Sequence, residues 1–460
     1  MPVIGSFAVP HPPLIVPKVG RGEEKMIKPT VEAYQEAARR CAALKPDVLI
    51  VLSPHSILYY DYFHISPRCS ASGSFAAFGV PDVRFDVKYD TELVDAIAHE
   101  ASVDGIAAGT LGERDRTLDH GTMIPLYFFQ PLLPDVPIVR IGLSGFSLVE
   151  HYRFGKAIAR AVDSLGRRAV IIASGDLSHR LKADGPYGFA AEGPEFDRRI
   201  MEIFASGDFG QLLRFDPTFC EAAAECGLRS FVIMAGAYDG RKVLCDALSH
   251  QDTFGVGYGV ACFLPGEPDE SRHFDVEFLA EERVRLDAIA AKEDLYVRLA
   301  RASLEAYVTT GRRMSLPSGL PDELTSRRAG AFVSIKKDGQ LRGCIGTIEP
   351  TRPTLAEEII GNAVSAGMND PRFPSVRKDE LPWLVYDVDV LNPAEPARRE
   401  DLDPKRYGVI VRSGMKCGLL LPNLDGVDTV DQQISIAMKK AGIRPSDHYT
   451  LERFEVVRHL

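Results

Sequence analysis

Short runs of β-branched and other apolar residues recur through the N-terminal part of the chain. They alternate with segments whose apolar side chains repeat at helical spacing, as in residues 29–44. The runs occupy residues 3–9, 47–52, 137–143 and 169–173. This alternation predicts a buried α/β sheet with flanking helices.

The pattern changes near residues 266–270, where the sequence becomes polar and contains prolines. A charged stretch with helical spacing then runs from about Asp275 to about Thr309. The whole chain has 460 residues, more than one compact domain usually holds. We therefore predict two domains, residues 1–272 and residues 285–460.

The second domain opens with a different pattern. Residues 331–336 alternate as a strand does, Asp338-Gly339 provides a tight turn, and the next strand resumes at Leu341, which predicts a hairpin. A capping box from Thr354 to Glu357 precedes a predicted helix over residues 355–366. Another helix is predicted to start at Asp428 and to end at Gly442. These elements indicate an α+β domain.

Composition and charge narrow the class of protein. Hydrophobic residues make up 45% and charged residues 26% of the chain, as in ordinary globular proteins. A net charge of -10 disfavours nucleic acid and anionic membranes as partners and favours small molecules or proteins. The eight cysteines form no Cys-x-x-Cys pair, and no apolar run reaches membrane-spanning length. We predict a cytoplasmic protein with reduced thiols.

Histidines follow three of the predicted strands within a few residues. His11 comes after residues 3–9, His55 after residues 47–52 and His179 after residues 169–173. In open α/β sheets ligands bind at the carboxyl ends of the strands, so three histidines at equivalent positions predict a functional site there. A fourth, His120, directly precedes a further segment of helical pattern.

Several imidazoles with one further ligand suit a transition metal. Two histidines and a carboxylate form the facial triad of non-haem Fe(II), whereas three histidines and water suit hydrolytic zinc. Glu225 is the candidate carboxylate, at the start of the apolar run 228–237. The neighbouring Cys226 is the alternative ligand, and the sequence leaves this choice open.

The motifs around these residues resemble one known family. They are similar to those of LigB-type class III extradiol ring-cleavage dioxygenases and of the related Memo proteins, over about residues 1 to 270. The motifs that carry the resemblance are His11-Pro-Pro, Ser53-Pro-His55, Leu118-Asp-His-Gly-Thr-Met-Ile-Pro-Leu126, Gly175-Asp-Leu-Ser-His179 and Glu225-Cys-Gly-Leu-Arg229.

The dioxygenase resemblance implies roles for individual residues. His11 and His55 match the histidine ligands of Fe(II), Glu225 matches the carboxylate ligand, and His179 matches the active-site acid/base. His120 matches a further pocket histidine. The implied reaction is oxygen-dependent cleavage of a catechol-like aromatic substrate, an oxidoreductase activity.

The Memo resemblance implies a different third ligand. In Memo proteins a cysteine stands at that position, which Cys226 matches, and Asp176 resembles a Memo pocket residue. A thiolate ligand favours softer or redox-active metals, so copper and zinc are the alternatives to iron. The Memo resemblance also allows a metal-binding regulatory or assembly protein without dioxygenase turnover.

The C-terminal half contains the motifs Leu341-Arg-Gly-Cys-Ile-Gly-Thr347 and Asn369-Asp-Pro-Arg-Phe-Pro374. These resemble the AMMECR family over roughly residues 285 to 460. Four residues are candidates for a second site: Arg342, Cys344, Asp370 and Arg372. Cys344 beside Arg342 is either a nucleophile or, as is commoner for a free cysteine, a packed structural residue. Asp370 and Arg372 are expected to pair across their turn.

The fusion of the two modules is similar to the bacterial arrangement called the AmmeMemoRadiSam system. That resemblance implies a radical SAM protein as partner. The chain itself contains no Cys-x-x-x-Cys-x-x-Cys motif for an iron–sulfur cluster, so the partner would be a separate protein.

Overall fold

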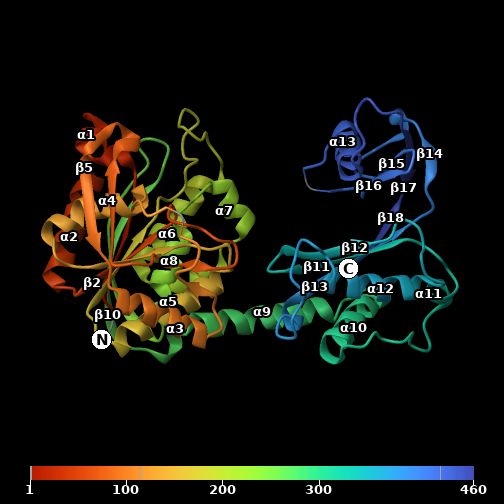
Figure 1. Ribbon diagram of the computed structural model, residues 1–460, viewed down its shortest axis with the longest axis horizontal. Coiled ribbons are helices and arrows are strands. Elements are labelled where there is room, and N and C mark those ends of the chain that lie inside the picture. Colours follow the sequence, from red (N-terminus) through yellow and green to blue (C-terminus); the bar gives the residue numbers. More distant parts are fainter. Residues whose placement is uncertain (1–2, 114, 425) are drawn as a thin grey trace. The chain divides into compact units, whose positions relative to one another are not determined.

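The structure of the chain is a computed structural model that describes residues 3–113, 115–424 and 426–460. The chain forms two compact units, of which the first ends at Leu279 and the second begins at Ala280. Figure 1 shows both units, coloured along the sequence. Each unit is described by itself below.

The first unit is built on a mixed sheet with the strand order β7-β2-β8-β1-β10-β9. The four strands from β7 to β1 run parallel, and β10 and β9 pair antiparallel. The strands of this sheet are β1 (Val3–Val9), β2 (Val48–Ser53), β7 (Ile138–Gly142), β8 (Ala169–Ser174), β9 (Arg241–Gln251) and β10 (Tyr258–Pro268). The α/β fold predicted for this part of the chain is confirmed, because the four predicted apolar runs form its parallel strands.

Two small strand pairs lie outside the main sheet: β3 (Phe63–His64) with β6 (Ala108–Gly109), and β4 (Ser70–Phe75) with β5 (Val80–Lys88). The helices of the first unit are α1 (Pro17–Gly20), α2 (Lys28–Leu44), α3 (Thr91–Val103), α4 (His120–Phe129), α5 (Leu148–Ser164), α6 (Glu192–Ser206), α7 (Pro217–Ala223), α8 (Leu228–Gly236) and the start of α9 (Phe274–Ala290).

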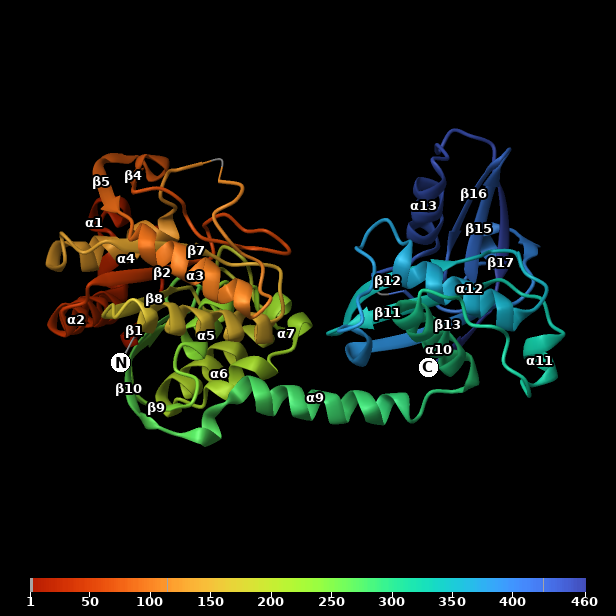
Figure 2. The ribbon, with the colours of Figure 1, turned by 60° about the horizontal axis from the view of Figure 1, so that its bottom comes forward.

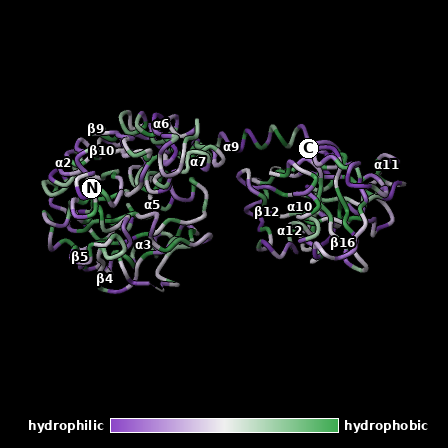
Figure 3. The backbone as a smooth tube through the Cα atoms, turned by 90° about the horizontal axis from the view of Figure 1, so that it is seen from above, coloured by the Kyte–Doolittle hydropathy of each residue, from purple (hydrophilic) through white to green (hydrophobic). Residues whose placement is uncertain are grey.

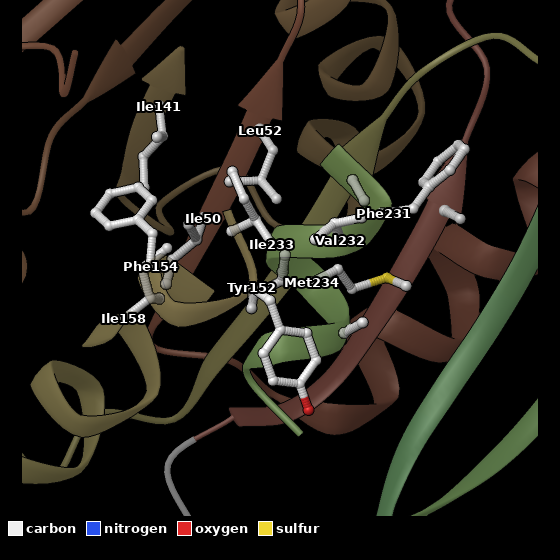
Figure 4. Packing of buried hydrophobic residues seen from close by; sticks show 14 of the residues in the cluster. Ile50, Leu52, Ile141, Tyr152, Phe154, Ile158, Phe231, Val232, Ile233 and Met234 are labelled. Carbon is white, nitrogen blue, oxygen red and sulfur yellow. The ribbon is translucent and has the colours of Figure 1, made fainter. Parts of the chain in front are cut away.

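Helices cover both faces of the main sheet. One hydrophobic cluster joins α3, α5 and α8 to one face, and a second cluster joins α2 and α4 to the other. Figure 4 shows the first cluster, in which Ile233 of α8 and Phe154 of α5 pack near Ile50 and Leu52 of β2. Because both faces are buried, the parallel strands consist mainly of apolar residues, as the sequence pattern indicated.

The second unit contains two sheets, with the orders β12-β11-β13-β18 and β14-β17-β15-β16. Its strands are β11 (Ala331–Lys337), β12 (Gln340–Gly346), β13 (Leu384–Leu391), β14 (Glu395–Ala397), β15 (Gly408–Ser413), β16 (Lys416–Leu420), β17 (Thr450–Phe454) and β18 (Val456–His459). Its helices are α10 (Leu295–Thr310), α11 (Asp322–Thr325), α12 (Leu355–Met368) and α13 (Val430–Ala441). Figure 2 shows these elements in a second view. The predicted α+β class is confirmed.

Three local predictions for this part of the chain need correction. The helical stretch predicted over 275–309 is two helices, because Asp294 caps α10 by accepting from the backbone N–H groups of Tyr296 and Val297. The helix predicted from Asp428 starts one residue after the cap Thr429. At α12 the Thr354 hydroxyl, not its backbone N–H, donates to Glu357, so only half of the capping box forms.

Hydrophilic segments lie mostly toward the outside of each unit (Figure 3). Across the described residues, no helix combines the length and apolar character that crossing a membrane would require.

Candidate metal centre

Three side chains from distant parts of the sequence converge at the carboxyl edge of the main sheet. The metal-binding atoms of His11, His55 and Cys226 lie within 4.8 Å of one another. The Nε2 atoms of His11 and His55 are 2.9 Å apart, and the Cys226 Sγ is 3.6 Å from the His11 Nε2. His11 is buried, Cys226 is partly buried and His55 is exposed, so the group opens to solvent on one side.

His11 is oriented by the neighbouring strand. Its Nδ1 shares a hydrogen bond of 2.9 Å with the Ser174 hydroxyl at the end of β8. Its backbone N–H donates to the Asp176 carboxylate at 2.7 Å. The Nε2 is therefore the ring nitrogen that faces His55 and Cys226, and the bond at Nδ1 fixes the direction of the ring.

The imidazole rings of His55 and His120 stack on each other. Their centroids are 4.0 Å apart in a stacked arrangement, and the His120 ring meets His11 edge-on at 5.5 Å. His120 is the first residue of α4, which Asp119 caps by accepting from the Thr122 N–H. The structure thus brings His120 beside the group of three, although it is not a member of that group.

The structure separates the adjacent residues Glu225 and Cys226. The Glu225 carboxylate accepts from the Leu228 N–H at 2.7 Å and so caps the start of α8. The Cys226 thiol instead faces His11 and the backbone of Asp176, whose N–H lies 3.3 Å from the sulfur. Of the two alternatives, the geometry places Cys226, not Glu225, at the third position.

Burial keeps the imidazoles of this site neutral. It lowers the pKa of His11 and of His55, and it lowers the pKa of His120 to about 4. Neutral imidazole is the form that binds metal ions. Burial also raises the pKa of the Cys226 thiol, and the nearby Asp176 and Glu225 carboxylates raise it further. Metal binding would therefore displace a proton from Cys226.

Asp176 lies beside the group, in contact with His11 and Cys226. Burial raises the pKa of its carboxyl to about 6, against the lowering effect of the His11 backbone N–H. One of its oxygens is 3.9 Å from the His11 Nε2. Asp176 is thus close enough to act on the electrostatics of the site.

His179 lies nearby but outside the group of three. Its ring stacks on Tyr187 at 5.1 Å, and burial lowers its pKa. Tyr187 is 59% exposed and belongs to the loop after β8, so one face of His179 is covered by an aromatic side chain at the surface.

The donor set fits a four-coordinate metal ion. With ordinary zinc bond lengths and tetrahedral angles, ligand nitrogens lie ~3.4 Å apart and nitrogen and sulfur ~3.6 Å apart. The distance of 3.6 Å from the Cys226 Sγ to the His11 Nε2 already equals the nitrogen–sulfur value. The Nε2 atoms of His11 and His55, 2.9 Å apart, would need to separate by only ~0.5 Å.

Sequence reasoning missed two residues that hold the site together. Ser174 hydrogen-bonds His11, and Asp119 hydrogen-bonds both Ser53 and the first turn of α4. Asp119 carried a signal, since an aspartate directly before a segment of helical pattern is a typical N-cap. Ser174 carried none, because its partner is 163 residues away.

The candidate residues of the second unit form two ion pairs around strand β12. Arg342 binds both carboxylate oxygens of Glu380, at 2.9 and 3.0 Å, so its guanidinium is already paired. Asp370 and Arg372 pair as expected. They also hold the edge of the strand, because Asp370 accepts from the Cys344 N–H and Arg372 donates to the Cys344 carbonyl.

The Cys344 thiol itself is only partly buried. It accepts a hydrogen bond of 3.3 Å from the Ser334 hydroxyl on the neighbouring strand. Both residues therefore have contacts within the second unit, Arg342 with Glu380 and Cys344 with Ser334, and a nucleophilic role for Cys344 stays a prediction.

Comparison with known proteins matches each unit to a family. The model described as "Catalytic LigB subunit of aromatic ring-opening dioxygenase" matches residues 5–261, and the AMMECR1 model matches residues 297–459. A protein of Clostridium acetobutylicum is 43% identical over 470 residues, covering 100% of this chain and 99% of its own.

Shorter relatives match part of the chain. A Thermotoga maritima protein is 51% identical over 170 residues, which is 36% of this chain and 98% of its own length. A crystal structure of an uncharacterized protein from Pyrococcus horikoshii is 32% identical, covers 36% of this chain and 89% of its own, and gives a TM-score of 0.34.

Proposed function

Since the chain belongs to the family of the catalytic LigB subunit of aromatic ring-opening dioxygenases, with an AMMECR1 domain after it, we propose that it is a metal-dependent oxidoreductase of that reaction type. The observation that carries this proposal is the convergence of His11, His55 and Cys226 at the carboxyl edge of the sheet. These three residues would hold the metal ion.

A bound ferrous ion would supply open coordination positions and redox activity for dioxygen and a catechol-like substrate. In extradiol ring opening both atoms of dioxygen enter the product, and the ring bond beside a hydroxyl-bearing carbon breaks. The substrate supplies the electrons, so no further reductant is consumed. The reaction requires a group that accepts a hydroxyl proton and returns it.

His179 is the residue that we assign to proton transfer. Its lowered pKa keeps the ring neutral at pH 7, so that it can accept a proton from a substrate hydroxyl. The Tyr187 ring stacks on the His179 ring. His120 lies against His55 and contacts the ring of Phe78 edge-on at 5.8 Å, which gives an aromatic substrate an apolar wall.

Cys226 favours a second candidate function. A thiolate at the third position departs from the two-histidine, one-carboxylate triad of ferrous oxygenases and suits copper or zinc as well as iron. The second candidate is a metal-binding regulatory or assembly protein without oxygenase turnover, acting with a radical SAM partner. The free thiols of the described cysteines support a cytoplasmic location for either function.

Metal analysis followed by an oxygen-uptake assay separates the two candidates. The full chain is purified without added metal, its iron, copper and zinc are quantified, and oxygen uptake is measured with a panel of catechols after loading with Fe(II). We expect bound metal near one equivalent per chain and uptake that His179→Ala reduces by at least a hundredfold, the lower range for loss of an acid/base group.

Two variants locate the metal. Cys226→Ala is expected to lose bound metal, whereas Glu225→Gln retains it, because Glu225 caps a helix instead of facing the histidines. Stoichiometric metal without uptake for any catechol would support the second candidate against the first. Retention of metal in Cys226→Ala together with its loss in Glu225→Gln would refute the assigned ligands.

A further inference from the structure

A charged side chain is buried on β7, the outermost parallel strand of the main sheet. Arg140 of β7 is only 2% exposed. Its guanidinium donates to the Ser66 hydroxyl at 2.7 Å, to the Thr117 carbonyl at 2.8 Å and to the Glu113 carboxylate at 3.2 Å. A buried charge is costly unless its partners are fixed around it, so Arg140 ties these residues to the sheet.

Arg140 also reaches Asp119, the residue that caps α4. Its Nη1 lies 3.8 Å from the Asp119 Oδ2. The same carboxylate accepts from the N–H and the hydroxyl of Thr122, at 3.0 and 2.9 Å. The ion pair therefore fixes the start of α4, and the first residue of that helix is His120.

Asp119 is linked in turn to the strand that delivers His55. The Ser53 hydroxyl, at the end of β2, donates to the Asp119 Oδ1 at 2.5 Å. The same oxygen of Ser53 accepts from the His55 backbone N–H at 3.3 Å. The contact is tight, because a Cβ atom added at Gly121 would lie 2.4 Å from the Ser53 hydroxyl oxygen.

We infer that Arg140, Asp119 and Ser53 act as one positioning unit that sets how His55 and His120 face the metal centre. None of the three would touch the metal. The unit joins β7, the start of α4 and the end of β2, so it fixes two histidines that the sequence separates by 65 positions. This inference rests on the proposed metal centre and adds the residues that determine its affinity and geometry.

Cobalt(II) titration of the full chain tests the inference. Cobalt reports the ligand field in its visible bands and thiolate bonding in its near-ultraviolet band. We expect Ser53→Ala to weaken cobalt binding at least tenfold, the effect typical of residues that orient metal ligands. The visible bands should shift, while the thiolate band persists because Cys226 contacts His11 and the Asp176 backbone instead of Ser53 or Asp119.

Two further variants isolate the buried charge. Asp119→Asn keeps an oxygen that can cap α4 but loses the ionic contact to Arg140, and Arg140→Lys keeps the charge but loses the forked hydrogen bonds. Both are expected to weaken cobalt binding by at least fivefold. The matched control is Arg160→Lys, which alters an exposed arginine paired with Glu100 and Asp104 and should leave affinity unchanged.

The outcomes distinguish this inference from the proposed function. A parent chain that binds no cobalt refutes the metal centre and the inference with it. A parent chain that binds cobalt, with Ser53→Ala and Asp119→Asn showing the same affinity and visible bands, refutes the positioning unit alone. If Arg140→Lys does not fold, the other two variants still decide.

Discussion

At the residue scale, Glu225 and Cys226 are the two candidates for the third metal ligand, a carboxylate and a thiolate. The two residues are adjacent, and either is a chemically sound ligand. Ala224, just before them, has a left-handed backbone with φ of 54° and ends α7. The turn that follows points one side chain at the helix start and the other at the histidines.

His64 is a second residue whose environment has a measurable consequence. It is fully buried, and neither ring nitrogen has a hydrogen-bond partner among the described residues. Burial, together with the smaller effect of the nearby Arg140 charge, lowers its pKa to about 4. The native protein therefore holds this ring neutral where an unfolded chain would protonate it.

The sign of the pH effect follows from proton binding. The unfolded chain binds a proton at His64 below a pH of about 6.5, whereas the native protein does so only near pH 4. Between these values the free energy of unfolding falls as the pH falls, by at most about 1.4 kcal/mol per pH unit. Above pH 6.5 the effect is absent.

We predict that His64→Leu removes this pH dependence. Relative to the parent, the variant should gain about 2 kcal/mol in the free energy of unfolding between pH 7 and pH 5. Urea unfolding of both proteins at the two pH values measures this. His99→Leu, which changes an exposed histidine on α3, is the control. If the free energy of unfolding fell by the same amount from pH 7 to pH 5 in the parent and in His64→Leu, the prediction would be contradicted.

At the element scale, the hairpin of β11 and β12 shows why glycines recur in its sequence. Asp338 and Gly339 both have positive φ, 52° and 74°, as the two-residue turn requires. Gly343 has a different role, because a Cβ atom there would lie 2.2 Å from the Ala366 carbonyl oxygen on α12. Gly339 is needed for the positive φ of the turn, and Gly343 is needed for the close approach of β12 to α12.

Alanine substitutions should separate these two roles. Gly343→Ala forces β12 away from α12, and we expect it to lower the free energy of unfolding by about 3 kcal/mol, as overpacking does. Gly339→Ala meets no atom within 4 Å and should cost only about 1 kcal/mol, from its positive φ. Denaturant midpoints of the second unit compare the two. Equal midpoints would show that the strand and helix move apart freely.

At the scale of the whole molecule, the two units have separate hydrophobic cores and the candidate metal ligands belong to the first alone. A ligand that binds only the folded state stabilises the unit that holds it, by about 2.7 kcal/mol at a concentration one hundred times its dissociation constant. The second unit gains nothing from that binding.

Calorimetry should therefore resolve a metal-dependent and a metal-independent transition. We expect added metal to raise the melting temperature of the first unit and to leave that of the second unchanged, with a chelator reversing the shift. His11→Ala should melt at the same temperature with and without metal. A metal-induced shift of both transitions, or a shift that survives in His11→Ala, would contradict the assigned centre.

The sequence determined the elements and the place of the histidines along them. Strand and helix periodicity depend on neighbouring residues, so the parallel strands could be read directly, with β1 predicted at its observed bounds. The turn at Asp338-Gly339 could be read for the same reason. The histidines that follow the strands indicated a candidate site at the carboxyl edge of the sheet.

Only the tertiary structure decided which side chains meet. The order β2-β8-β1 places His55 and His11 on either side of the strand that ends in Ser174, which is a matter of long-range packing. The choice of Cys226 over Glu225 depends on a turn direction that two adjacent residues cannot specify. The hydrogen bonds of Arg140 likewise join segments far apart in sequence, so no pattern of neighbouring residues could predict them.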